Sequence, residues 1–246
     1  MNRRSLLGLT FLASASGLLL LVVIAGRPSV AAEPAADKWE ADIAAFEAAD
    51  RESPPTAGGV LFVGSSSIRM WKLDRWFPDR HAINRGFGGS QIADVNRYTT
   101  RIVLPYKPRT ILFYAGDNDI NAKKSPEQVA ADFTAFVGMV RGELPETMIH
   151  FIAIKPSLKR WEQYPTQHRA NSLIEAMCQS DPRLTYIDVV TPMLGDDGMP
   201  RPELFADDGL HLSDTGYALW TDIVLPLLAT ARPRDSEEPP LATPRR

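Results

Sequence analysis

Two short polar segments of the sequence have the composition of a serine nucleophile and its base. Residues 64–67, Gly-Ser-Ser-Ser, follow an apolar run, and residues 207–211, Asp-Asp-Gly-Leu-His, contain Asp208 and His211. A serine on a tight turn before a helix exposes its hydroxyl beside the positive end of the helix, which suits a nucleophile that must build an oxyanion. An aspartate three residues before a histidine can hydrogen-bond to the imidazole and fix its tautomer. Taken alone, the two segments also fit a serine N-cap and a turn with a surface histidine.

Two further loops offer N–H donors that an oxyanion needs. Residues 84–90 are rich in glycine, which lets a backbone N–H approach a ligand closely. Residues 116–119, Gly-Asp-Asn-Asp, contain Asn118, whose amide has the donors to reach into a site. Taken singly, both loops are more typical of plain turns. A metal site at Asp117 and Asp119 is a weaker alternative, because the further oxygen ligands of a calcium loop are missing.

The elements around these loops predict an α/β protein. Short apolar runs predict five buried strands, over residues 59–64, 81–84, 110–115, 148–154 and 184–189. Apolar spacing and capping residues predict four helices, over residues 38–52, from 126 to about 140, 166–180 and from 213 to about 229. Strands that alternate with helices indicate a three-layer sandwich with a central parallel sheet. Ligands bind at the carboxyl ends of such strands, where three of the four segments lie.

Composition excludes several classes of protein. The chain has 27 Lys and Arg against 30 Asp and Glu, a formal net charge of −3 and a sequence pI of about 5.8, which argues against a nucleic-acid binder. Its single cysteine, Cys178, excludes an intramolecular disulfide and a cysteine-based zinc site. With 44% hydrophobic and 23% charged residues, the composition is that of an ordinary globular protein.

The two ends of the sequence differ from its middle. Residues 1–32 predict an export signal, with Arg3 and Arg4 before an uncharged, leucine-rich stretch and small residues at 29–32. Residues 5–26 are also long enough to span a bilayer, so a retained membrane anchor is the alternative. Residues 33–231 predict the folded domain, and the proline-rich residues 232–246 a disordered tail. We therefore expect a periplasmic or extracellular location.

The four segments together resemble the SGNH hydrolases, also called the GDSL esterase/lipase family. The resemblance covers about residues 58–229. The first block of the family, Gly-Asp-Ser, is similar to residues 64–66, although serine replaces the central aspartate. The second block falls on Gly89, the Gly-x-Asn-Asp block is matched in full by residues 116–119, and the Asp-x-x-His block is matched by Asp208 and His211.

The resemblance implies a flavodoxin-like fold and a serine esterase mechanism. Ser66 would be the nucleophile, His211 its base and Asp208 the acid that orients the base. The backbone N–H groups of Ser66 and Gly89 and the side chain of Asn118 would form the oxyanion hole. The resemblance implies no cofactor and no metal.

The substrate is left open by the sequence. The family covers lysophospholipids, short acyl esters and acetylated sugars, and the same residues would serve an O-acyltransferase that modifies an envelope polysaccharide. A non-catalytic binding module is the third alternative, which the set of matched residues disfavours. Two groups of side chains are possible substrate contacts: the cations Arg69, Lys155 and Arg160, which we expect to be solvated surface charges, and the aromatics Trp71, Trp161 and Tyr164, which we expect in the core. The oligomeric state is not predicted.

Overall fold

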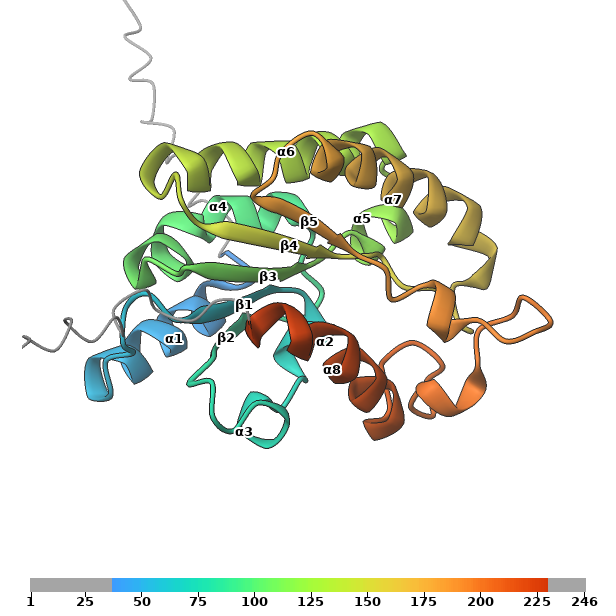
Figure 1. Cartoon of the computed structure of the whole chain (residues 1–246), viewed down its shortest axis with the longest axis horizontal. Coiled ribbons are helices and arrows are strands. Elements are labelled where there is room, and N and C mark those ends of the chain that lie inside the picture. Colours follow the sequence, from blue (N-terminus) through green and yellow to red (C-terminus); the bar gives the residue numbers. More distant parts are fainter. Residues whose placement is uncertain (1–36, 230–246) are drawn as a thin grey trace, which may run out of the picture. The chain divides into compact units, whose positions relative to one another are not determined.

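The computed structural model of the protein describes residues 37–229, so the predicted export signal and tail lie outside the described residues. A parallel sheet of five strands forms its centre (Figure 1). The strands are β1 (Val60–Gly64), β2 (Ile83–Gly86), β3 (Thr110–Tyr114), β4 (Met148–Ile152) and β5 (Leu184–Ile187). They are arranged in the order β2-β1-β3-β4-β5, which is the flavodoxin-like order of a doubly wound sheet. The predicted fold class is therefore confirmed.

Side chains of the sheet alternate between two hydrophobic cores. In β1, Leu61 and Val63 belong to one core, whereas Val60 and Phe62 belong to the other. The period of two is that of an extended strand, and every residue of β1 and β3 is buried because both faces of the sheet are covered.

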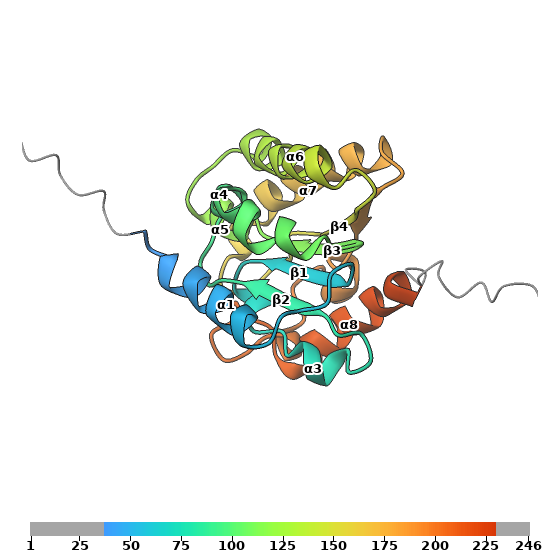
Figure 2. The same cartoon turned by 90° about the vertical axis from the view of Figure 1, so that its left-hand side faces the viewer.

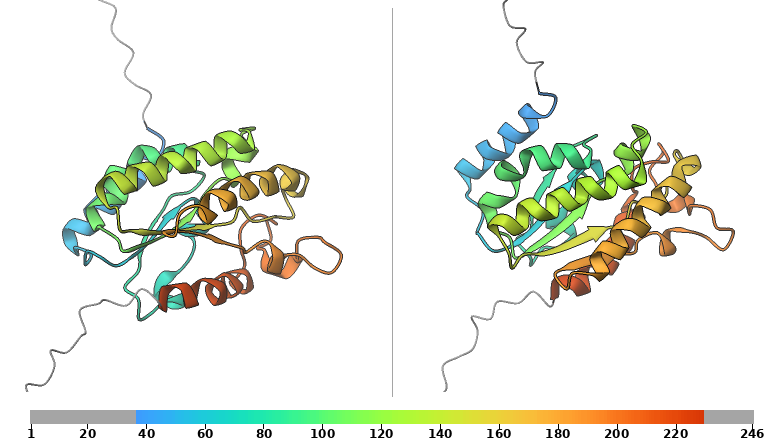
Figure 3. Two further views of the ribbon diagram at one scale, coloured as in Figure 1. Left: turned by 45° about the horizontal axis from the view of Figure 1, so that its top comes forward. Right: turned by 90° about the horizontal axis from the view of Figure 1, so that it is seen from above.

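Helices cover both faces of the sheet (Figures 1 and 2). One face packs against α1 (Glu40–Glu52), α4 (Ile92–Ile102), α6 (Pro126–Glu143) and α7 (Tyr164–Gln179), which lie side by side when seen from above (Figure 3). The other face packs against α2 (Ser66–Arg69), α3 (Leu73–Trp76) and α8 (Asp214–Ala229). Short helical turns complete the described elements: α5 (Asp117–Asn121), η1 (Leu104–Tyr106), η2 (Trp161–Gln163), η3 (Thr191–Met193) and η4 (Pro202–Leu204). None of the helices in residues 37–229 has the length and apolar character needed to cross a membrane.

The predicted elements are present, with shifted ends and four omissions. The second strand occupies residues 83–86 instead of 81–84, because its pairing with β1 begins at Ile83 and continues to Gly86. The helix predicted over 166–180 begins earlier, at Tyr164. Ser125 caps α6 by accepting a hydrogen bond from the backbone of Gln128, and Ser213 similarly accepts one from Gly216 before α8. The helices α2, α3, α4 and α5 were not predicted.

The omitted α4 has a clear amphipathic pattern. Its buried residues recur every three or four positions: Ile92, Val95, Tyr98, Thr99 and Ile102. Gln91 and Asp94 cap its first turn reciprocally. The spacing of these apolar residues is typical of a helix, so α4 could have been predicted from the sequence.

Candidate active site

A tight turn after β1 presents Ser66 at the carboxyl edge of the sheet. The backbone N–H of Ser65 donates to the carbonyl oxygen of Tyr114 at 2.9 Å, and α2 begins at the next residue. Gly64, with φ of 142°, makes this turn possible, because a Cβ atom there would lie 1.9 Å from the carbonyl oxygen of Tyr114. The chain therefore turns sharply between strand and helix, as a nucleophile at this position requires.

The short helix α2 is held from both sides. The side-chain amide of Asn84, on β2, donates to the carbonyl oxygens of Ile68 at 2.7 Å and Trp71 at 3.1 Å. The hydroxyl of Tyr217, on α8, donates to the carbonyl oxygen of Ser67 at 2.9 Å. A helix of four residues has little stability of its own, so these contacts fix the position of Ser66.

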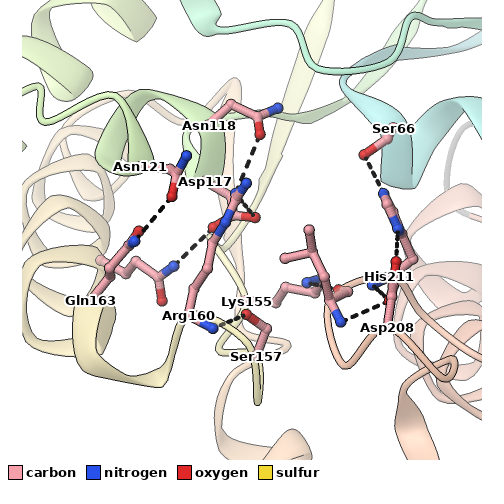
Figure 4. Close-up of polar contacts among 12 residues, drawn as sticks. Ser66, Asp117, Asn118, Asn121, Lys155, Ser157, Arg160, Gln163, Asp208 and His211 are labelled. Atoms are coloured by element: carbon pink, nitrogen blue, oxygen red, sulfur yellow. Dashed lines mark hydrogen bonds and ion pairs between the residues drawn. The ribbon is translucent and has the colours of Figure 1, made fainter.

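The structure brings Ser66, His211 and Asp208 into one hydrogen-bonded line (Figure 4). His211 Nε2 lies 3.1 Å from Ser66 Oγ, and His211 Nδ1 lies 2.6 Å from Asp208 Oδ2. Since an ionised carboxylate only accepts hydrogen bonds, Nδ1 carries the proton and the neutral imidazole offers the Nε2 lone pair to the Ser66 hydroxyl. This is the arrangement of a nucleophile, a base and an orienting acid.

Asp208 is fixed by its own loop. Its Oδ1 accepts hydrogen bonds from the backbone N–H groups of His211 and Leu210, both at 2.9 Å. These two donors, followed by the His211 side chain, hold the pKa of the carboxyl well below its usual range. The neighbouring Asp207 makes no such contact with His211.

The three predicted oxyanion donors line the same pocket as Ser66 and His211. Asn118 Nδ2 donates to the carbonyl oxygen of Ser90 at 3.0 Å, and Asn118 Oδ1 accepts a hydrogen bond from Arg160 at 3.3 Å. These contacts orient the amide and use one of the two N–H bonds on Nδ2. The second N–H of Asn118 and the backbone N–H groups of Ser66 and Gly89 have no acceptor within residues 37–229. The pocket thus holds three donors for a developing negative charge.

Arg160 supports Asn118 in a way that the sequence did not indicate. Its guanidinium donates to Asp117 Oδ2 at 2.8 Å as well as to Asn118, and Asp117 Oδ1 accepts from Gln167 at 3.0 Å (Figure 4). Arg160 lies 42 residues from Asn118 in the chain, and only the approach of the segment before α7 to α5 brings the two together.

The two aspartates considered for a metal are engaged with other groups. Asp117 is paired with Arg160, and the buried Asp119 accepts from Lys124 Nζ at 3.0 Å and from the backbone of Ile92 at 3.1 Å. Burial raises the pKa of Asp119, although Lys124 opposes this change. Within the described part of the chain, no three histidine, cysteine or acidic side chains gather in a way that could hold a metal ion.

The pocket beside Ser66 has a volume of about 320 Å³. Arg69, Lys155 and Arg160 all line it. The prediction that these cations are solvated surface charges is wrong for Lys155, which is 1% exposed, and for Arg160, which is largely buried in its ion pair with Asp117. Lys155 lies three residues after the end of β4 and donates to the carbonyl oxygen of Leu210 at 2.7 Å.

The three aromatic residues are divided between core and surface. Trp71 is in the core, as predicted, where it packs against Phe62 and Trp220. Trp161 and Tyr164 stack on each other with ring centroids 4.7 Å apart and remain partly exposed, so the core prediction is wrong for Trp161, whereas Tyr164 packs against the core. Neither lines the pocket beside Ser66.

Comparison with known proteins agrees with this description. The sequence model of the GDSL-like Lipase/Acylhydrolase family matches residues 56–219. No curated protein sequence matches the chain.

Solved structures with the same fold share little sequence identity with this chain. A Streptococcus pneumonia protein assigned as a platelet activating factor has a TM-score of 0.70 at 21% identity, over 78% of this chain and 93% of its own. A GDSL-like lipase from Bacteroides thetaiotaomicron has a TM-score of 0.67 at 16% identity, over 78% and 99%. An acetylxylan esterase from Geobacillus stearothermophilus, solved as a catalytic mutant, has a TM-score of 0.57 at 13% identity, over 70% and 95%.

The family match spans most of the described residues and includes the loops that carry Ser66, Gly89, Asn118 and His211. The chain therefore belongs to the GDSL-like lipase/acylhydrolase family, the SGNH hydrolases.

Proposed function

We propose that this protein is a serine hydrolase of carboxylic esters. The observation that carries the proposal is the line of hydrogen bonds from Ser66 to His211 and Asp208, at 3.1 Å and 2.6 Å, beside a pocket lined by three N–H donors. Family membership supports a hydrolase, and the geometry supports Ser66 as its nucleophile. Asp208 stays ionised over the physiological range because its pKa is lowered, which favours the cationic form of His211 that arises during catalysis.

The reaction follows from these positions. Ser66 Oγ attacks the ester carbonyl carbon while His211 Nε2 takes the hydroxyl proton, and the carbonyl oxygen becomes an oxyanion held by N–H groups of Ser66, Gly89 and Asn118. Collapse of this intermediate breaks the bond to the alcohol, which leaves with the proton from His211. Water then attacks the acyl-enzyme, gives its proton to His211, and releases the carboxylic acid as Ser66 regains its proton.

The proposal also includes a small acyl group on the ester and a location outside the cytoplasm. Solved neighbours include an acetylxylan esterase and a lipase, and the pocket of about 320 Å³ favours a small acyl group over a long chain. We also propose that the protein acts outside the cytoplasm, because residues 1–32 have the pattern of an export signal or a membrane anchor.

Hydrolysis of 4-nitrophenyl acetate and butyrate by the Ser66→Ala variant tests the proposal. We expect Ser66→Ala to abolish turnover, because no other hydroxyl in the turn is hydrogen-bonded to His211. The Ser65→Ala and Ser67→Ala variants are matched controls, since both side chains are adjacent and buried, and both should keep most of the activity. Full activity in Ser66→Ala, with an unchanged circular dichroism spectrum, would refute the proposal.

A further inference from the structure

The pocket beside Ser66 is positively charged, although the chain as a whole is not. The chain has a formal net charge of −3. The residues that line the pocket include three cations, Arg69, Lys155 and Arg160, against one carboxylate, Asp117, which gives a net charge of +2 with His211 neutral. A concave site with one sign of charge concentrates the field and raises the local concentration of ligands with the opposite charge.

The single carboxylate of the lining neutralises only one of the three cations. Asp117 is paired with Arg160 at 2.8 Å and accepts a second hydrogen bond from Gln167. Arg69 and Lys155 form no ion pair with a carboxylate of the described residues. Two positive charges beside the reacting serine are therefore not held in a close ion pair, although Asp117 and Asp208 lie near enough to act on Lys155.

Arg69 presents its free guanidinium directly beside the oxyanion donors. Its Cζ would lie 2.9 Å from a Cβ atom built on Gly88, so the guanidinium packs on the bare backbone of that residue. The next residue is Gly89, a predicted oxyanion donor, and Lys38 Nζ would lie 3.7 Å from a Cβ atom built there. Arg69 is exposed and its side chain makes no hydrogen bond with the described residues, so the N–H groups of its guanidinium are free for a ligand.

Lys155 forms a buried positive wall of the same pocket. Its amino group has up to three donors and makes one hydrogen bond, to the carbonyl oxygen of Leu210. Burial lowers the pKa of Lys155, because a charge is costly in the interior, although the charges of Asp117 and Asp208 oppose this change. An anion in the pocket would reduce this cost.

We propose that the ester substrate carries a negatively charged group, a carboxylate or a phosphate, that binds to Arg69 close to the scissile ester. The field of Lys155 adds to this attraction. This inference rests on the proposed esterase function and narrows its substrate to anionic esters. A neutral ester would leave Arg69 without a partner, whereas an anionic ester gains a charge-assisted hydrogen bond to it.

Matched pairs of esters that differ only in charge test the inference. In the first pair, 4-acetoxybenzoate is compared with 4-acetoxybenzamide, so the charge is on the alcohol side. In the second, monophenyl adipate is compared with its terminal amide, so the charge is on the acyl side. A third compound, 4-acetoxyphenyl phosphate, is also compared with 4-acetoxybenzamide as its neutral partner and distinguishes phosphate from carboxylate. The measured quantity is the ratio of kcat/KM for the anionic ester to kcat/KM for its neutral partner, determined with intact protein.

We expect Arg69→Gln to lower this ratio in at least one series by about tenfold to a hundredfold, the effect of one hydrogen bond to a charged group. Arg69→Lys keeps the charge and should retain part of the preference, which also guards against a folding defect in the glutamine variant. Lys72→Gln is the control, since it removes the same charge nearby without lining this pocket. For the wild type, the ratio of kcat/KM values should decrease as the salt concentration is raised from about 0.05 to 0.5 M, because salt screens exposed charges.

A ratio that is the same in wild type and Arg69→Gln, in both series and for the phosphate, would overturn the inference. An equal decrease in Lys72→Gln would also overturn it, because general surface charge would then be the cause. The proposed function fails separately, if the wild type hydrolyses no ester or if Ser66→Ala keeps its activity on the neutral members.

Discussion

At the scale of single residues, the hydrogen bonds of Asp208 decide which nitrogen of His211 carries the proton. Asp208 uses one carboxylate oxygen for two backbone N–H groups and the other for His211, so neither oxygen can rotate away from its partner. The Nε2 atom of His211 is left facing Ser66. If Asn replaced Asp208, its amide N–H could donate to Nδ1 of His211, which favours the tautomer with the proton on Nε2 and removes the lone pair that faces Ser66.

Asp208→Asn is therefore expected to lower kcat for ester hydrolysis by up to about 10⁴-fold with little effect on folding. Asp207→Asn, one residue earlier and exposed, is the matched control and should be close to wild type. Steady-state kinetics on one neutral ester checks both variants. If Asp207→Asn lowered kcat while Asp208→Asn left it unchanged, the orienting acid would have been assigned to the wrong residue.

Asn118→Ala should lower kcat by about 10²–10³-fold with little change in KM, because the amide donates to an oxyanion that forms during the attack and is absent from the bound ester. Asn121→Ala is the control on the same short helix, where the side chain contacts Gln163 and does not line the pocket. An increase in KM at constant kcat would make Asn118 a binder of the ground state instead.

Sequence reasoning was most effective for residues whose neighbours in the chain define them. Asp208 and His211 contact each other within one loop, and Asn118 lies in a four-residue block, so their spacing is visible in the sequence. Arg160 and Lys155 could not be assigned in this way. Their partners are 42 and 55 residues away, and an isolated arginine or lysine is usually a surface charge.

At the scale of elements, the site is assembled from loops at the carboxyl ends of β1, β2 and β3 and from the loop before α8. The strands β1 and β3 were predictable because both faces of the sheet are covered and their sequences are largely apolar, whereas β2 contains Asn84 and Arg85 and gives a weaker signal. The ends of the strands were less predictable, since pairing with the neighbouring strand decides them. The short helix α2 has no periodic signal over its four residues, and its contacts with Asn84 and Tyr217 are purely tertiary.

Lys155 links the end of the β4 segment to the loop of His211, since its amino group donates to the carbonyl oxygen of Leu210. Lys155→Met keeps the stem of the side chain and removes the donor. We expect kcat to fall by about tenfold or more, because small displacements of a catalytic group are costly. The free energy of unfolding should not decrease, since a buried charge that is not held in a close ion pair is replaced by an apolar group. Loss of stability with unchanged kcat, measured by urea unfolding and kinetics, would contradict this role.

At the scale of the whole molecule, one buried imidazole makes stability depend on pH. His150 lies within β4, and its burial lowers its pKa from 6.5 to about 4. Between these two values, the unfolded chain binds a proton that the folded protein does not. The free energy of unfolding therefore decreases as the pH falls from 6.5 to 4, by about 3 kcal/mol from this group.

Urea unfolding of wild type and His150→Leu at several pH values between 7 and 4 isolates this contribution. The leucine variant cannot titrate at this position, so it should lose about 3 kcal/mol less than wild type over this range. Parallel curves for the two proteins would show that His150 is accessible to protons in the folded state.

Labelling with a fluorophosphonate, followed by peptide mapping by mass spectrometry, tests the central assignment most directly. Such a reagent forms a stable adduct with a serine that a neighbouring base activates, and three serines adjoin in this turn. We predict one adduct, on Ser66, that is absent from Ser66→Ala. An adduct on Ser65 or Ser67 in the wild-type protein, or equal labelling of Ser66→Ala, would contradict the account.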